Sequence, residues 1–109
     1  MNEKDKALIL EFKKNLPPEL KGHLKRLIVF GSKVRRDAAE ESDLDVIALV
    51  DEKTPEVEKN LEDIAYQVMW DHDFKPIISL KVFSESRFYD AFNRGFSFYR
   101  HVEKEGVAV

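Results

Sequence analysis

The chain contains no cysteine, and this absence removes several kinds of chemistry at once. Disulfide bonds, a thiol nucleophile and cysteine-ligated zinc are all excluded. No apolar run is long enough to cross a bilayer, and the charged opening segment, residues 1–6, lacks the apolar centre of a secretory signal. These features lead us to expect a protein of the reducing cytoplasm.

A strong excess of charge is also missing. Eighteen Lys and Arg face 21 Asp and Glu, which gives a formal net charge of −3, so we do not expect a broad nucleic-acid-binding surface. Only four Gly and four Pro are present, and they form no linker. A length of 109 residues with eight Phe suits one domain, residues 1–109, with a modest core.

The apolar spacing predicts an α/β (α+β) domain in which helices pack against at least three strands. Asn2, Thr54 and Ser84 are expected to cap three of the helices. The first helix is expected to direct Ala7, Leu8, Phe12 and Leu16 to one side. The expected helices cover residues 3–15, 19–23, 33–36, 55–70, 85–94 and 96–104, and the expected strands cover 24–30, 44–50 and 77–83.

The chemistry is expected between the first two strands, where a turn and two acids stand close to strand ends. Gly31-Ser32 follows the first strand, and Asp43 and Asp45 stand at the start of the second. Strand residues two apart share a face, so the two carboxylates lie side by side and repel unless a cation lies between them. Mg²⁺ prefers such oxygen ligands, and a glycine turn lets backbone N–H groups approach a phosphate.

These residues resemble a known signature. Gly31-Ser32, ten intervening residues and Asp43-x-Asp45 are similar to the motif of the DNA polymerase beta-like nucleotidyltransferase superfamily. The short chain and Ser42 resemble its minimal nucleotidyltransferase (MNT) branch. The resemblance implies a mixed sheet and Mg²⁺-dependent transfer of a nucleoside monophosphate, AMP from ATP, to a hydroxyl acceptor.

The resemblance also implies roles for individual residues. Asp43 and Asp45 are the expected catalytic metal ligands. The expected nucleotide-binding residues are Gly31, Ser32, Arg35 and Ser42. For Arg35, a solvated polar turn is an equally good interpretation, and for Lys33 and Arg36 it is the better one.

The sequence departs from the family pattern at two places. Relatives place a third carboxylate on the strand that follows the long helix, but residues 77–83 contain neither Asp nor Glu. Ser79 has the facing position, and Lys81 shares its face; Asp73 precedes the strand and is a candidate to compensate. Arg36 stands where many relatives have Gly, which puts the loop geometry there in doubt.

The departures leave alternatives open. A chain this short has little room to bind an acceptor, and the resemblance implies a helical HEPN protein as partner, with this chain as an antitoxin that attaches AMP to it. Homo- or hetero-oligomers are both compatible with the sequence. The alternative function is a catalytically weakened nucleotide- or partner-binding module. Least favoured is a domain in which Asp43 and Asp45 only cap a strand.

Two further segments have two interpretations each. Asp71-His72-Asp73 contains metal-binding residue types, but a polar helix terminus is the commoner explanation. The aromatic segment Phe96 to Tyr99 is a candidate contact surface, with core packing as the default interpretation.

Overall fold

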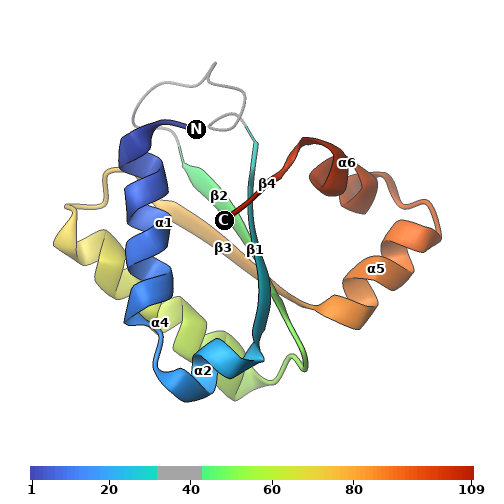
Figure 1. Cartoon of the computed structure of the whole chain (residues 1–109), viewed down its shortest axis with the longest axis horizontal. Coiled ribbons are helices and arrows are strands. Elements are labelled where there is room, and N and C mark those ends of the chain that lie inside the picture. The colour runs from blue at the N-terminus through green and yellow to red at the C-terminus, as the bar shows by residue number, and fades with distance from the viewer. Residues whose placement is uncertain (32–42) are drawn as a thin grey trace.

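The computed structural model describes residues 1–31 and 43–109 (Figure 1). Within this part of the chain, four strands form one sheet and five helices surround it. None of the described helices is long and apolar enough to cross a membrane. The elements are α1 (Glu3–Asn15), α2 (Pro18–His23), β1 (Leu24–Phe30), β2 (Leu44–Val50), α4 (Pro55–Asp71), β3 (Ile78–Ser84), α5 (Glu85–Asn93), α6 (Ser97–Glu105) and β4 (Val107–Ala108).

The sheet is mixed, as the family resemblance implies, and its strand order is β3-β2-β1-β4. β1 pairs antiparallel with β2 and with β4, whereas β2 and β3 run parallel. Parallel neighbours need a crossover connection, which α4 provides. β2 is therefore central, and all its residues except Asp45 are buried.

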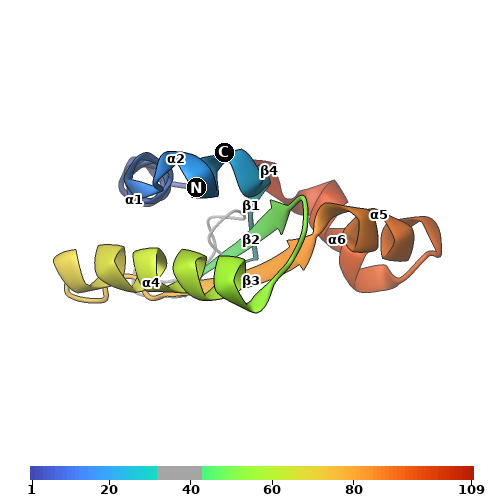
Figure 2. The ribbon, with the colours of Figure 1, turned by 90° about the horizontal axis from the view of Figure 1, so that it is seen from below.

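The helices cover the two faces of the sheet unequally (Figures 1 and 2). α1, α2 and α4 pack on one face over the larger core, which takes Val46 and Ala48 from β2. α5 and α6 pack on the other face over a smaller core, which takes Ile47 and Leu49. Because successive strand residues alternate between faces, Asp45 lies on the same face as Ile47 and Leu49.

The three expected helix caps are confirmed. The side chains of Asn2, Thr54 and Ser84 each accept a hydrogen bond from the backbone N–H three residues later. Each bond satisfies one of the N–H groups that have no partner within the first helical turn. These caps fix where α1, α4 and α5 begin, and the sequence-based bounds of those helices agree with the structure to within one residue.

Two expectations about local structure need correction or extension. Ala7 is exposed, and Ile9 lies in the core beside Leu8 and Phe12. The short strand β4 was not expected, because its two exposed residues carry no alternating pattern and pair only with β1. The helix expected at residues 33–36 lies outside the described residues.

Gly106, between α6 and β4, occupies a position with no room for a side chain. A Cβ there would lie 2.5 Å from Ile28 Cγ2 and 2.5 Å from the carbonyl oxygen of Val102. We expect Gly106→Ala to destabilise the protein by roughly 1–3 kcal/mol through overpacking. Chemical denaturation measures the loss.

Gly22 provides the matched control for this substitution. It lies inside α2, and a Cβ added to it would meet nothing within 4 Å, so Gly22→Ala is expected to stabilise the protein by roughly 0.5–1 kcal/mol. Equal effects of the two substitutions would contradict this account of the α6–β4 junction.

Candidate active site

Gly31 and Asp45 come into direct contact at the end of β1. Phe30, the last residue of β1, pairs with Asp45, and Gly31 follows with a φ of +90°. A Cβ on Gly31 would lie 2.7 Å from Asp45 Oδ2, so the carboxylate occupies the space that any other residue's side chain would need. The structure therefore brings Gly31 and the second acid of the motif together, as the sequence predicts.

Asp43 and Asp45 are close enough to influence each other. Burial is the main cause that raises the pKa of the Asp45 carboxyl above its usual 3.8. The charge of Lys81 opposes this rise, and the charge of Asp43 adds to it. Asp43 itself precedes β2 and is exposed to solvent. The two carboxylates therefore concentrate negative charge at the start of the central strand, β2, with Asp45 partly buried and Asp43 exposed.

This donor set fits a hard divalent cation. Burial and the charge of Asp43 both disfavour the ionised form of Asp45 and so raise its pKa. A cation beside the two carboxylates would offset both effects. No cluster of three or more His, Cys, Asp or Glu side chains suited to a metal is found in residues 1–31 and 43–109. Mg²⁺ commonly uses one or two carboxylates and completes its shell with water and substrate phosphates, so Asp43 and Asp45 suffice for one ion.

The strand next to Asp45 carries no acid at the facing position. The parallel register pairs Asp45 with Ser79 and Ile47 with Lys81, so Ser79 and Lys81 lie on the face that carries Asp45. Among the described residues, Asp73 forms no metal-binding group with Asp43 and Asp45. The alternation of β3 in the sequence correctly placed Ser79 and Lys81 on one face.

Lys81 makes contacts that the sequence did not reveal. Its Nζ lies 6.0 Å from the ring centroid of Phe30 and 5.7 Å from that of Phe98, and these two rings meet edge to face at 5.9 Å. Phe98 belongs to α6, far from β3 in the sequence, so only the packing of α6 on the sheet brings it here. The ammonium group thus lies beside two aromatic rings, and its charge acts on Asp45.

Three of the expected nucleotide-binding residues, Ser32, Arg35 and Ser42, lie outside the described residues. Of the expected site, the structure brings together Gly31, Asp43 and Asp45. The roles assigned to all six residues remain predictions.

Asp71-His72-Asp73 is a helix terminus in the structure. His72 caps α4, and its Nε2 lies 3.1 Å from Glu11 Oε2 on α1, which ties the two helices together. Asp71 Oδ1 accepts a hydrogen bond from Gln67. The metal-binding interpretation of this segment gains no support from these contacts.

The aromatic segment Phe96 to Tyr99 contributes one ring to the core and leaves two rings partly exposed. Tyr99 packs into the smaller core, with its ring centroid 5.2 Å from that of Phe88. Phe96 and Phe98 remain 56% and 37% exposed, so both keep surface available for contact.

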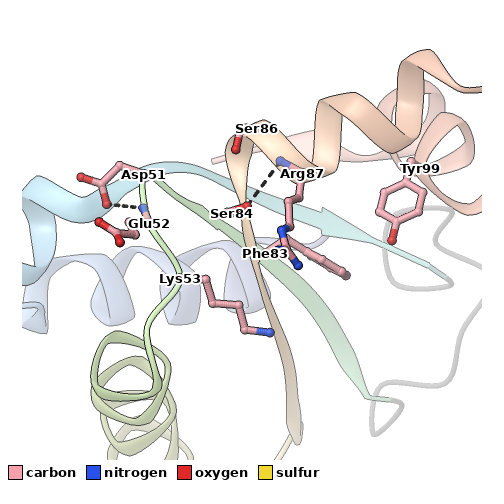
Figure 3. A pocket seen from close by; sticks show the side chains of 8 residues that line it. All are labelled: Asp51, Glu52, Lys53, Phe83, Ser84, Ser86, Arg87 and Tyr99. Atoms are coloured by element: carbon pink, nitrogen blue, oxygen red, sulfur yellow. Dashed lines mark hydrogen bonds between the residues drawn. The ribbon is translucent and has the colours of Figure 1, made fainter.

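A cavity of about 510 Å³ lies where the parallel strands β2 and β3 end (Figure 3), whereas Asp45 lies near the start of β2. Its lining includes Asp51, Lys53, Arg87 and Tyr99. Two of the lining residues, Phe83 and Tyr99, contact Phe98. Because Phe98 lies beside Lys81, the cavity extends toward the candidate site. Neither Asp43 nor Asp45 lines it.

Comparisons with known proteins identify the family of the chain. The family model described as "Nucleotidyltransferase domain" matches residues 6–108. A protein of Methanocaldococcus jannaschii named "putative protein adenylyltransferase" is 41% identical over 105 residues, which cover 94% of this chain and 95% of that protein. The match spans the sheet, the helices on both of its faces and the carboxylate pair. The chain belongs to the nucleotidyltransferase domain family, and it is a nucleotidyltransferase by fold and by descent.

Proposed function

We propose that this protein transfers AMP from ATP to a hydroxyl group of an acceptor, in a reaction that depends on Mg²⁺. The observation that carries the proposal is the contact between the Gly31 turn and the Asp45 carboxylate, with Asp43 beside it. Family membership supports nucleotidyl transfer in general. The name of the M. jannaschii relative supports a protein as the acceptor.

Each described residue has a distinct part in this proposal. Asp43 and Asp45 hold the divalent ion, which neutralises phosphate charge when it is bound. Gly31, with its positive φ and no side chain, lets the turn after β1 approach the phosphates. Ser32, Arg35 and Ser42 are the proposed additional contacts to the nucleotide.

The reaction itself is a substitution at the α-phosphorus of ATP. The acceptor oxygen forms a new bond to that phosphorus, and the bond to the oxygen that bridges the α- and β-phosphates breaks. Pyrophosphate leaves with the electron pair, and the acceptor's hydroxyl proton passes to solvent. The protein contributes mainly by positioning the groups and by stabilising charge.

Labelled ATP tests this proposal. Protein extract from the source organism is incubated with the enzyme, Mg²⁺ and ATP that is labelled at either the α- or the γ-phosphate. We expect a discrete acceptor band to carry the α-label and none to carry the γ-label. Label from the γ-phosphate would identify a phosphoryl transferase and overturn the proposal. The Asp43→Asn/Asp45→Asn double variant, added in place of wild type, is the control for contaminating transferases.

A second candidate is a nucleotide- or partner-binding module with weakened catalysis. The register that places Ser79 and Lys81 beside Asp45, where no acid stands, favours it. Under this alternative the protein binds ATP–Mg²⁺ and co-purifies with its partner, but the partner stays unlabelled. Label on the partner eliminates this alternative.

We further propose a helical HEPN protein of the cytoplasm as the acceptor, with this chain acting as its antitoxin. The family resemblance implies this choice, and the relative's name supports a protein as the acceptor without naming which. Co-expression with a candidate HEPN protein tests it, since AMP attachment should add about 329 Da, the mass of AMP minus water, to one partner hydroxyl. An unmodified, fully active partner would rule it out.

A further inference from the structure

The charged side chains of the candidate site differ from those of a site with three carboxylates. The described residues contribute two acids, Asp43 and Asp45, and one base, Lys81, to this part of the sheet. With a nucleotide triphosphate that carries about four negative charges, three carboxylates and two divalent ions leave a net charge of about −3. Two carboxylates, the Lys81 ammonium group and one divalent ion leave the same net charge of about −3, so this site reaches that balance with a single ion.

Lys81 lies beside two aromatic rings on the face of the candidate site. It projects from the middle of β3 on the face that carries Asp45, two residues beyond Ser79. The rings of Phe30 and Phe98 both lie within 6.0 Å of its Nζ, and the side chain remains solvent-exposed. An ammonium group that lies beside two rings and is open to solvent is well placed to meet an incoming anion.

We propose that Lys81 supplies the second positive centre of this site, so that the protein binds its nucleotide with one divalent ion instead of two. The proposal rests on the nucleotidyl-transfer function proposed above. Lys81 contacts the phosphate chain directly, and no second metal site forms beside Ser79. The nucleotide's phosphates replace part of the hydration of the ammonium group.

Metal counting tests this inference without any measurement of activity. Equilibrium dialysis with Mn²⁺ and α,β-methylene-ATP, which resists transfer, gives the number of ions that each chain retains. We expect one Mn²⁺ per wild-type chain. We expect close to two for Ser79→Asp/Lys81→Met, because that variant adds a third carboxylate beside Asp45 and removes the ammonium group. Two ions on the wild-type chain would overturn the inference and leave the proposed function intact.

Nucleotide affinity provides the second readout. Lys81→Met is expected to weaken binding of the analogue about tenfold or more, whereas Lys81→Arg keeps it within a few-fold. Lys25→Met is the matched control: Lys25 is also an exposed strand lysine, and its charge acts on Asp51 at the far end of β2. Equal affinities of Lys81→Met and wild type would refute a direct contact. No binding by the wild-type chain would refute the proposed function together with this inference.

Discussion

Replacing Asp45 with asparagine is expected to abolish nucleotidyl transfer and yet to leave the protein at least as stable as wild type. Loss of a ligand to the divalent ion removes about 4 kcal/mol of transition-state stabilisation, or roughly a thousandfold in rate. The stability gain comes from the same carboxylate. Burial, and after it the charge of Asp43, raises the pKa of Asp45 against the opposing effect of Lys81, so the folded protein bears a cost for keeping this group ionised.

The sign of the pH dependence follows from the raised pKa. Asp45 binds its proton more tightly in the folded state than in the unfolded state, where the pKa is about 3.8. The cost is therefore absent below that pH and complete above the raised pKa of the folded state. Because solvent screens most of it, the gain in Asp45→Asn is under about 1 kcal/mol, or a few degrees in Tm at pH 7, and it shrinks as the pH falls toward 3.

Differential scanning fluorimetry with and without Mg²⁺ and ATP measures both sides of this prediction. The ligands should raise the Tm of wild type and leave that of Asp45→Asn unchanged, since only the former binds them. A variant that unfolds well below wild type in the absence of ligand would show that Asp45 is a structural residue. It would then support the interpretation in which the acid only caps a strand.

Gly31→Ala is expected to be the most damaging addition of a single methyl group at the site. Its positive φ of +90° costs an alanine roughly 1–2 kcal/mol, and its Cβ would meet Asp45 Oδ2 at 2.7 Å. Either the carboxylate or the turn must move. We expect nucleotide affinity to fall at least about tenfold, as when one charged contact is lost. Calorimetric titration with ATP and Mg²⁺ measures the change.

Gly95 is a matched control for this substitution. Its φ of +86° imposes the same backbone strain, but the nearest atoms to its Cβ position belong to Arg100, at 3.8 Å or more. Gly95→Ala should therefore lose similar stability and keep full nucleotide affinity. If both variants bound nucleotide as wild type does, the contact between Gly31 and Asp45 would have no role in binding.

Much of the fold could be predicted from the sequence because its signals are local. Short apolar runs at residues 27–30 and 46–50 mark β1 and β2, and side-chain caps mark the starts of α1, α4 and α5. The strand β4 escaped prediction because its existence depends on pairing with β1 and on no pattern of its own. Ala7 was misplaced because a helix with apolar residues on several sides does not define its buried face unambiguously.

The sequence likewise predicted one part of the candidate site and missed another. The order of Gly31, Asp43 and Asp45 along the chain was enough to expect their meeting, since two neighbouring strands and the segment between them set the distance. The position of Lys81 beside Phe30 and Phe98 could not be predicted from the sequence. It requires α6, which begins more than 60 residues after β1, to pack back onto the sheet. Contacts between elements distant in sequence are set by packing, which no local pattern encodes.

The measurement that bears most directly on the central claim is a calorimetric titration of ATP and Mg²⁺ into three proteins: wild type, Asp43→Asn/Asp45→Asn and Asp71→Asn/Asp73→Asn. The last pair repeats the same acid spacing at the end of α4, a helix that packs on the sheet face opposite the one that carries Asp45. Wild type and the α4 variant should bind the nucleotide equally, and the Asp43/Asp45 variant should show no metal-dependent binding. Metal-dependent binding by that variant at wild-type affinity would contradict the account.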